Sequence, residues 1–307
     1  MLLRSMPDLS PANTQYRSWF YAHWGRENCL ILAHSREAEY ERYRQRLSIK
    51  MASSGRERYF IDARTVAVDD DNYLILNEGR QYGSVIRSDR EVESFSIFFR
   101  PGLLDDVFGA VDIDSESMLE RSTASMRRSP EFLERLNPHD ATVTPVLRFI
   151  RHHIRAGVDD ERWYEEQLQV LAVRMLVQHR NTRMQALALQ CVKPATRVEI
   201  YRRMGLAADF IHSCYDRDIG LEHMAAAACL SVHHFMRTFR KIYGVTPMEY
   251  LYRKRVRAAE RLRDSEKFSM QEIATRVGFN SRATFYRQLQ RWGTADLETQ
   301  GRSLSGS

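Results

Sequence analysis

Apolar residues in the C-terminal third of the chain recur with helical spacing, and the pattern appears twice. Residues 221–241 and 270–291 each predict a short helix, a tight turn and a second helix with a charged outer face. The two copies align with an offset of 49 residues before the turn and 50 after it, because the second turn is one residue longer. Apolar pairs at i and i+4 share one helix face, so the following side chains are expected to pack inward: Phe235, Phe239, Phe279, Phe285 and Leu289.

The residues between the two copies predict one connecting helix. Thr246 and Glu249 form a capping box with proline at the first helical position, and nothing breaks the helix before Arg263. Ser269 and Glu272 form a second capping box that opens the second copy. A helix of about 17 residues rises roughly 25 Å, and successive major grooves lie ~34 Å apart. A spacer of this length can hold both second helices on one face of DNA.

Short apolar runs dominate roughly the first 115 residues. Glycine, asparagine, aspartate and serine recur between the runs, at intervals typical of an antiparallel sandwich or a small barrel. The acidic run Asp69–Asp71 lacks the spaced ligands of a calcium loop and predicts a turn. The predicted strands are residues 47–51, 59–61, 65–68, 73–76 and 95–99.

Two helices are predicted between the strands and the repeated pattern. The first opens at Thr144 and closes at Gly157, and the second begins at Asp159–Asp160 and runs to about Arg180. Residues 181–195 then predict an interdomain linker, since Pro194 limits continuation of the helix. The second helix has an apolar stripe that could pack on its own barrel or form the seam of a helix pair in a dimer: Tyr164, Leu168, Leu171 and Met175.

Length and charge add to this pattern. A chain of 307 residues is long enough for two domains with separate cores. Residues 196–292 hold 18 Lys or Arg and 10 Asp or Glu, a net charge of +8, whereas the whole chain carries +6. The positive charge therefore lies where phosphates would be met. No apolar run predicts a membrane span and no signal peptide is expected. The four scattered cysteines favour a reducing cytoplasm over a disulfide framework or a zinc site.

The C-terminal pattern resembles the AraC/XylS family of bacterial transcription regulators. The resemblance rests on the stretches CLSVHHFMRTFRKIYGVTPMEYLYRKRVRAAERL and SMQEIATRVGFNSRATFYRQLQRW, and covers about 100 residues. It implies a DNA-binding domain of seven helices with two reading helices. Cys229 replaces the usual glycine of the first turn, where a left-handed conformation costs a non-glycine residue roughly 1 kcal/mol. The chain also departs from the family after Trp292, so the family's last helix is not predicted with the rest.

The front half resembles, less specifically, the cupin-like jelly-roll sensor of many AraC-type regulators. The predicted fold is therefore an α+β multidomain chain with an N-terminal cupin-like β-barrel, a helical linker and an all-α double helix-turn-helix domain. Such an arrangement implies an effector-binding role for the barrel and a dimerisation role for the helices after it. The expected domains are residues 1–120, 121–190 and 191–296, followed by a disordered tail over 297–307.

The residues expected to contact DNA are those left on the outer faces once the core positions are removed. Arginines are expected to pair with guanine, Met236 and Ala283 to make apolar contacts, and Arg240 and Lys241 to hold phosphates. The basic residues Arg253–Arg255 and Arg257 of the connecting helix could either contact phosphates or form a solvated face. The predicted DNA-binding residues are His233, Met236, Arg237, Arg240, Lys241, Arg282, Ala283 and Arg287.

These patterns favour a cytoplasmic transcription regulator, an effector-responsive activator, that binds double-stranded DNA as a homodimer and contacts RNA polymerase if it activates. One alternative is a cupin-type enzyme fused to a DNA-targeting module. Against it, the strand region has no His-x-His pair, so no catalytic residue, metal or cofactor is expected. Another alternative is a regulator-like protein with impaired DNA binding. The sequence leaves open whether the barrel holds a small molecule or is filled by side chains.

Overall fold

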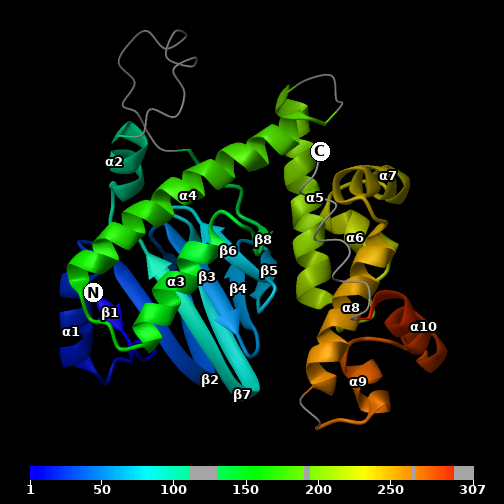
Figure 1. Cartoon of the computed structure of the whole chain (residues 1–307), viewed down its shortest axis with the longest axis horizontal. Helices are drawn as coiled ribbons and strands as arrows, with labels where there is room; N and C mark the ends of the chain where they lie inside the picture. The colour runs from blue at the N-terminus through cyan, green and yellow to red at the C-terminus, as the bar shows by residue number, and fades with distance from the viewer. Residues whose placement is uncertain (111–129, 190–193, 265–266, 294–307) are drawn as a thin grey trace. The chain divides into compact units, whose positions relative to one another are not determined.

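A computed structural model of the chain describes residues 1–110, 130–189, 194–264 and 267–293. The chain divides into two compact units, an N-terminal unit (Met1–Gln190) and a C-terminal unit (Cys191–Ser307). The first is rich in β-strands and the second is helical (Figure 1). The predicted class, a β-rich domain followed by an all-α domain, is confirmed. The predicted disordered tail, residues 297–307, lies outside the described residues.

The N-terminal unit is built on a largely antiparallel sheet in the strand order β1-β2-β7-β3-β6-β8, with β4 pairing β5 and β7. All five predicted strands are present. The sequence pattern missed β2 and the first half of β7. The second half of β2 pairs with the first half of β7 in a long charged arm, with pairs such as Glu39–Arg87 at 2.9 Å, whereas Cys29–Ala33 at the start of β2 is a buried apolar run. The strands are β1 (Leu2–Leu3), β2 (Cys29–Arg44), β3 (Ser48–Ser53), β4 (Glu57–Ile61), β5 (Arg64–Val68), β6 (Asn72–Leu76), β7 (Gln81–Phe98) and β8 (Leu136–Pro138).

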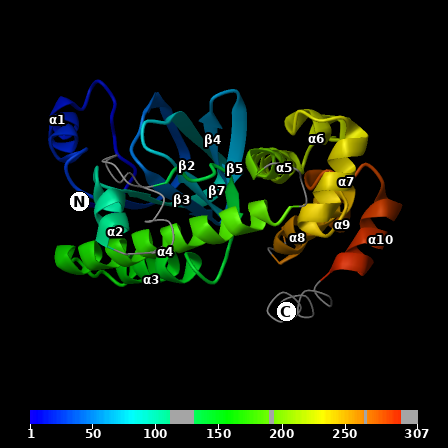
Figure 2. The same ribbon diagram turned by 90° about the horizontal axis from the view of Figure 1, so that it is seen from above.

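Alternation along the strands gives the sheet two different faces. On β3, Ile49 and Met51 join the core that packs under the helices, whereas Lys50 points into the barrel interior. β7 alternates in the same way, with Phe95 on the helix face and Ser94 on the interior face. Figures 1 and 2 show α3 (Thr144–Arg155) and α4 (Glu161–Leu187) lying across one side of the sheet. The other helices in the described part of this unit are α1 (Thr14–His23) and α2 (Leu103–Ala110).

Helix α4 decides between the two alternatives for its apolar stripe and corrects the predicted bounds of the linker. Leu168, Leu171 and Met175 are fully buried in a core that includes Leu147 of α3 and Phe95 of the sheet. The stripe therefore packs on its own barrel, and it cannot also be the seam of a dimer. The helix also continues through Leu187, so residues 181–187, predicted as linker, are helical.

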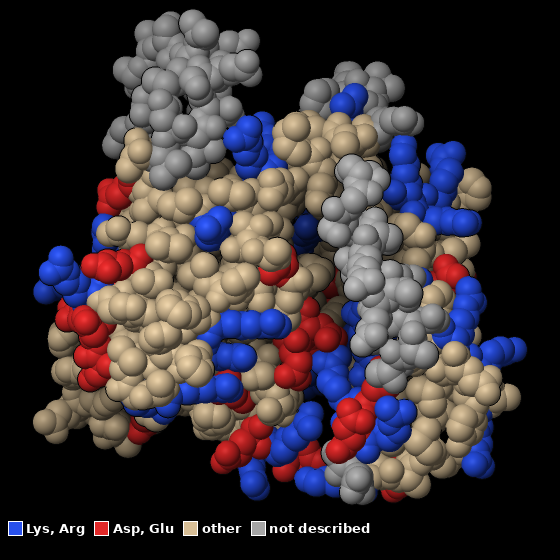
Figure 3. Space-filling view, viewed as in Figure 1, with Lys and Arg blue, Asp and Glu red and all other residues tan. Residues whose placement is uncertain are grey.

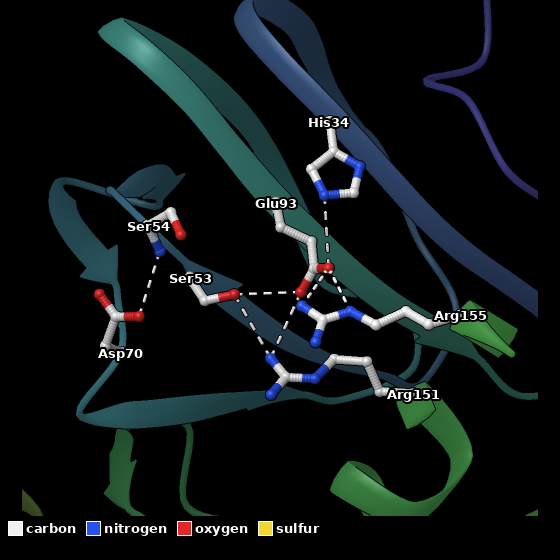
Figure 4. A network of polar contacts seen from close by, with 7 residues as sticks. All are labelled: His34, Ser53, Ser54, Asp70, Glu93, Arg151 and Arg155. Carbon is white, nitrogen blue, oxygen red and sulfur yellow. Dashed lines mark hydrogen bonds and ion pairs between the residues drawn. The ribbon is translucent and has the colours of Figure 1, made fainter. Parts of the chain in front are cut away.

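A buried carboxylate joins α3 to the sheet (Figure 4). Glu93 of β7 is 2% exposed and accepts hydrogen bonds from Arg155 Nε at 2.8 Å and Ser53 Oγ at 3.0 Å. Arg151 Nη1 lies 3.4 Å from Glu93 Oε1, the oxygen that Ser53 contacts. His34 Nε2 lies 3.4 Å from Glu93 Oε2, the oxygen that Arg155 contacts. Buried carboxylates need such partners because desolvation is costly. We assign this network a structural role, because α3 and three strands meet at it.

The acidic run is a turn, as predicted. Asp69 Oδ1 accepts hydrogen bonds from the Asp71 backbone amide at 3.0 Å and from Asn72 Nδ2 at 2.9 Å. These bonds replace backbone partners in the tight connection between β5 and β6. The adjacent Asp70 accepts from the backbone amide of Ser54 at 3.1 Å.

The described residues of the C-terminal unit form helices around one core. Phe235, Phe239 and Phe285 are fully buried and Phe279 is 6% exposed, while Leu289 packs against this cluster, as the periodicity predicts. The residues from 294 onward, where the family's last helix would lie, are outside the described part of the chain. None of the described helices is long and apolar enough to cross a membrane. The helices are α5 (Pro194–Cys214), α6 (Leu221–Ala227), α7 (Val232–Tyr243), α8 (Pro247–Arg263), α9 (Met270–Arg276) and α10 (Arg282–Trp292).

Candidate nucleic-acid interface

Helices α6 and α7 form the first of two helix-turn-helix pairs. Cys229 in the turn between them has φ +51°, the left-handed conformation that the missing glycine would have adopted. The backbone amide of Leu230 donates to the carbonyl of Ala225, so the turn is closed in spite of the cysteine. Arg203 of α5 donates to the Cys229 carbonyl at 3.2 Å and places a cation beside this turn. The sequence analysis did not select Arg203, because it precedes the repeated pattern.

Helices α9 and α10 form the second pair, and here the turn needs glycine. Gly278 has φ +88°, and a Cβ atom on it would lie 2.7 Å from the carbonyl oxygen of Tyr215. The amide of the next residue, Phe279, donates to the Ala274 carbonyl at 2.9 Å. The close approach of this turn to the segment after α5 therefore fixes α9 and α10 on the rest of the unit.

Both predicted capping boxes are present. The Thr246 amide donates to Glu249 Oε2 at 2.9 Å, and the Glu249 amide donates to Thr246 Oγ1 at 3.3 Å. Ser269 and Glu272 repeat these bonds at the start of α9. The hydrogen bonds from the Thr246 backbone and hydroxyl lower the pKa of Glu249, as those from Ser269 lower that of Glu272. These caps set where α8 and α9 begin, and hence the spacing between α7 and α10.

The second helix of each pair presents its predicted contact residues to solvent. Figure 3 shows Lys and Arg side chains along the outer edge of this unit, at the places of α7 and α10 in Figure 1. Tyr286 and Gln290 lie on the same exposed side of α10, with Arg282 5.8 Å from the Tyr286 ring. All eight predicted residues are exposed: His233, Met236, Arg237, Arg240, Lys241, Arg282, Ala283 and Arg287.

Two basic residues of the connecting helix fit neither of their expected roles. Arg255 is 6% exposed, and its Nε and Nη2 donate to the carbonyls of Tyr215 and Arg217 at 2.7 and 2.8 Å. Lys254 is also buried, with Nζ 3.0 Å from His212 Nε2. They therefore neither meet phosphates nor form a solvated face.

The other two basic residues of the connecting helix differ from each other. The guanidinium of Arg253 lies 4.0 Å from the ring of Trp292, and Arg257 is exposed. Of the group Arg253–Arg255 and Arg257, only Arg257 keeps the solvated position that the sequence allowed. Taken unit by unit, the described ranges bring together no group of three His, Cys, Asp or Glu side chains at metal-binding distance.

Comparison with known proteins agrees with this geometry. Residues 224–294 match a family model described as a helix-turn-helix domain, of the AraC type. The regulator AlkR of Acinetobacter baylyi, an HTH-type transcriptional regulator, is 31% identical over 81 residues, which cover 26% of this chain and 26% of AlkR. The chain thus matches about a quarter of the length of that relative.

Among solved structures, ToxT from Vibrio cholerae with a bound unsaturated fatty acid matches 86% of this chain and 91% of its own, at 9% identity and a TM-score of 0.35. The DNA-binding domain of AdpA in complex with target DNA matches 34% of this chain and 98% of its own, at 25% identity and a TM-score of 0.29.

Proposed function

Because its C-terminal region is an AraC-type helix-turn-helix domain, we propose that this protein is a sequence-specific, DNA-binding transcriptional regulator. One observation carries the proposal: α7 and α10 expose matched basic faces, while their apolar pairs are buried in a shared core. A helix pair that served only as core would not need Arg237 and Arg287 at equivalent exposed positions. The cytoplasm, where the DNA is, is the expected compartment.

The two second helices divide into reading and positioning residues. Arg237 and Arg287 lie where they can pair with O6 and N7 of guanine in the major groove. Near them, Met236 and Ala283 offer apolar contact to a thymine methyl, and His233 can donate or accept. Arg282 belongs to the same reading face of α10. Toward the end of α7, Arg240 and Lys241 are placed to hold phosphates, which set orientation without reading sequence.

The N-terminal unit is proposed as the sensory part of an effector-responsive activator. It holds a cavity in the barrel interior. The cavity lies on the face of the sheet that points away from α3 and α4. A small-molecule effector, RNA polymerase and a second copy of the chain are the proposed partners besides DNA. If the protein forms a homodimer, the surface is not the Leu168–Met175 stripe, because that stripe is already buried. A dimer would raise the effective concentration of the second DNA-binding domain at a repeated site.

DNA binding by the full-length protein is expected to depend steeply on salt. With about six phosphates neutralised, log K should fall with log[salt] at a slope near −5. The experiment first selects a bound site from random duplex DNA and then measures its affinity between about 50 and 200 mM salt. Failure to enrich any duplex, or an affinity that does not change with salt, contradicts the proposed function.

Arg287→Ala and Arg237→Ala are each expected to weaken binding to the selected site by about 1–3 kcal/mol and to relax base preference at one position. Lys241→Ala should weaken all sequences by similar factors, because a phosphate contact carries no base information. The exposed Arg90 in the N-terminal unit provides the matched control, and Arg90→Ala should change neither quantity. Unchanged affinity and preference in Arg287→Ala would show that α10 does not read DNA.

A further inference from the structure

A buried lysine without a polar partner lies in the cavity of the N-terminal unit. Lys50 of β3 is 2% exposed, and its Nζ lies 3.3 Å from the centre of the Phe98 ring and 5.5 Å from that of Tyr82. Within the described ranges its ammonium makes no hydrogen bond or ion pair. A buried cation with unfilled N–H donors is costly. A bound ligand with a hydrogen-bond acceptor would therefore satisfy the Lys50 ammonium.

The polar neighbours of Lys50 are held by other partners. The Glu57 carboxylate accepts from Ser94 Oγ at 2.7 Å and is hydrogen-bonded to the Tyr59 hydroxyl. The hydroxyls of Tyr82 and Ser48 lie 3.0 Å apart. Glu57 still attracts the Lys50 charge across space without forming an ion pair with it.

The cavity offers a guest one further polar contact. The buried Oε1 of Gln45 has no hydrogen-bond partner and lines the same space. This oxygen can accept a hydrogen bond from a donor on the guest. Lys50 and Gln45 thus bring two unsatisfied polar groups to the lining of one cavity.

The walls of the cavity indicate the rest of the guest. Its volume is about 50 Å³, enough for roughly four waters or a small organic molecule. Phe20 of α1, Trp24 and Phe98 provide aromatic walls. Met6 and Pro7 of the N-terminal segment also line the cavity. The Tyr40 hydroxyl holds this segment in place by donating to the Pro7 carbonyl at 2.9 Å. An apolar body with one polar end fits such a space.

We propose that this cavity binds a small organic monocarboxylate, with Lys50 paired to the carboxylate and the aromatic walls around the organic body. The inference rests on the proposed sensory role of the N-terminal unit and names the chemical class of its effector. A single cation balances a single negative charge. A doubly charged phosphate would have to be desolvated beside Glu57 with only Lys50 to neutralise it, since Arg46 is not among the residues that line the cavity.

Binding should be linked to a proton. The pKa of Lys50 is lowered to about 7, mainly by burial and to a lesser extent by the charge of Arg46, while Glu57 and Cys29 oppose the shift. The charged amine is the form that pairs with a carboxylate, so binding favours protonation. At pH 6 most empty sites already carry the proton, and at pH 8 about one in ten does. The affinity for a carboxylate should therefore fall about tenfold from pH 6 to pH 8.

Titration calorimetry of the full-length protein tests the proposal with acetate, propionate and butyrate, and with butyramide as the uncharged analogue of butyrate. We expect one carboxylate per chain, at least tenfold weaker binding of butyramide than of butyrate, and loss of carboxylate binding in Lys50→Met. The exposed Lys267 gives the matched control, and Lys267→Met should bind as the unchanged protein does. Equal binding of butyramide and butyrate, unchanged binding in Lys50→Met, or no binding of any of the three acids overturns the proposal.

Proton uptake gives a second test on the unchanged protein, in case Lys50→Met does not fold. Titrations at pH 8 in two buffers with different ionisation enthalpies should show close to one proton taken up per carboxylate bound. Uptake near zero overturns the pairing with Lys50. DNA binding measured in the same preparation without a carboxylate separates the two proposals. DNA bound with no carboxylate bound contradicts only this inference, whereas a carboxylate bound with no DNA bound contradicts only the proposed function.

Discussion

Leu171→Glu is expected to unfold the N-terminal unit rather than to separate a dimer. Leu171 is fully buried between α3 and the sheet, in a cluster of apolar side chains. Burying an unpaired charge in place of a packed leucine should cost about 4 kcal/mol or more. The expected result is loss of the cooperative thermal transition of this unit, which is measured by near-ultraviolet circular dichroism.

The neighbouring residue on the same helix provides the control. Val170 is 43% exposed, so Val170→Glu should leave the transition within about 0.5 kcal/mol of the unchanged protein. Sedimentation of both variants separates the two interpretations of α4. A folded, monomeric Leu171→Glu protein beside a dimeric parent would restore the dimer seam and contradict the assignment of this stripe to the core.

Gly278→Ala is expected to loosen α9 and α10 and to weaken DNA binding. The left-handed backbone costs an alanine about 1–2 kcal/mol. The overlap of its Cβ with the Tyr215 carbonyl, at 2.7 Å, adds a further 1–3 kcal/mol. Hydrogen–deuterium exchange over residues 270–292 should accelerate accordingly, and affinity for the selected DNA should fall because Arg287 is no longer held in place.

A second glycine of the same unit isolates the steric part of this effect. Gly244 ends α7 with φ +72°, but no atom lies within 4 Å of a Cβ built on it. Gly244→Ala should therefore cost only the backbone penalty, about 1–2 kcal/mol. Cys229 shows that a side chain is accommodated in the first turn at φ +51°. If Gly278→Ala and Gly244→Ala accelerate exchange equally, the contact with Tyr215 does not fix the second turn.

The buried polar residues Glu93, Arg255 and Lys50 differ in whether they have hydrogen-bonding partners. Glu93 and Arg255 are buried with several hydrogen-bonding partners each, and their burial holds elements together. Lys50 is buried with aromatic rings and no hydrogen bond in the described part of the chain. Since burial without a partner destabilises a protein, Lys50 is the residue of this group that a ligand would explain. This contrast is why the proposed effector site is placed in the barrel and not at the Glu93 network.

Much of the C-terminal unit follows from the sequence, because its signals are local. Capping boxes at Thr246 and Ser269 involve residues three positions apart, and the i, i+4 phenylalanines fix which face of α7 and α10 is buried. The positions that are left form the outer faces of these helices. The exposure of Arg237 and Arg287 could therefore be predicted without knowing which elements pack against α7 and α10. The five predicted strands follow from alternating or continuous apolar residues for the same reason, although the apolar run Cys29–Ala33 at the start of β2 was missed.

The tertiary structure alone decided what the buried groups pack against. Helical periodicity shows that Leu171 is buried but not in which partner, and a basic helix face gives no sign that Arg255 meets two carbonyls some 40 residues away. The second half of β2 and the first half of β7 have too little apolar pattern to predict, since their pairing comes from backbone bonds between distant segments. The role of Lys50, which lies within the apolar strand β3, became apparent only from the aromatic rings of Tyr82 and Phe98 on β7. Local spacing thus determined the helices and their exposed residues, whereas long-range contacts decided the core partners and the cavity.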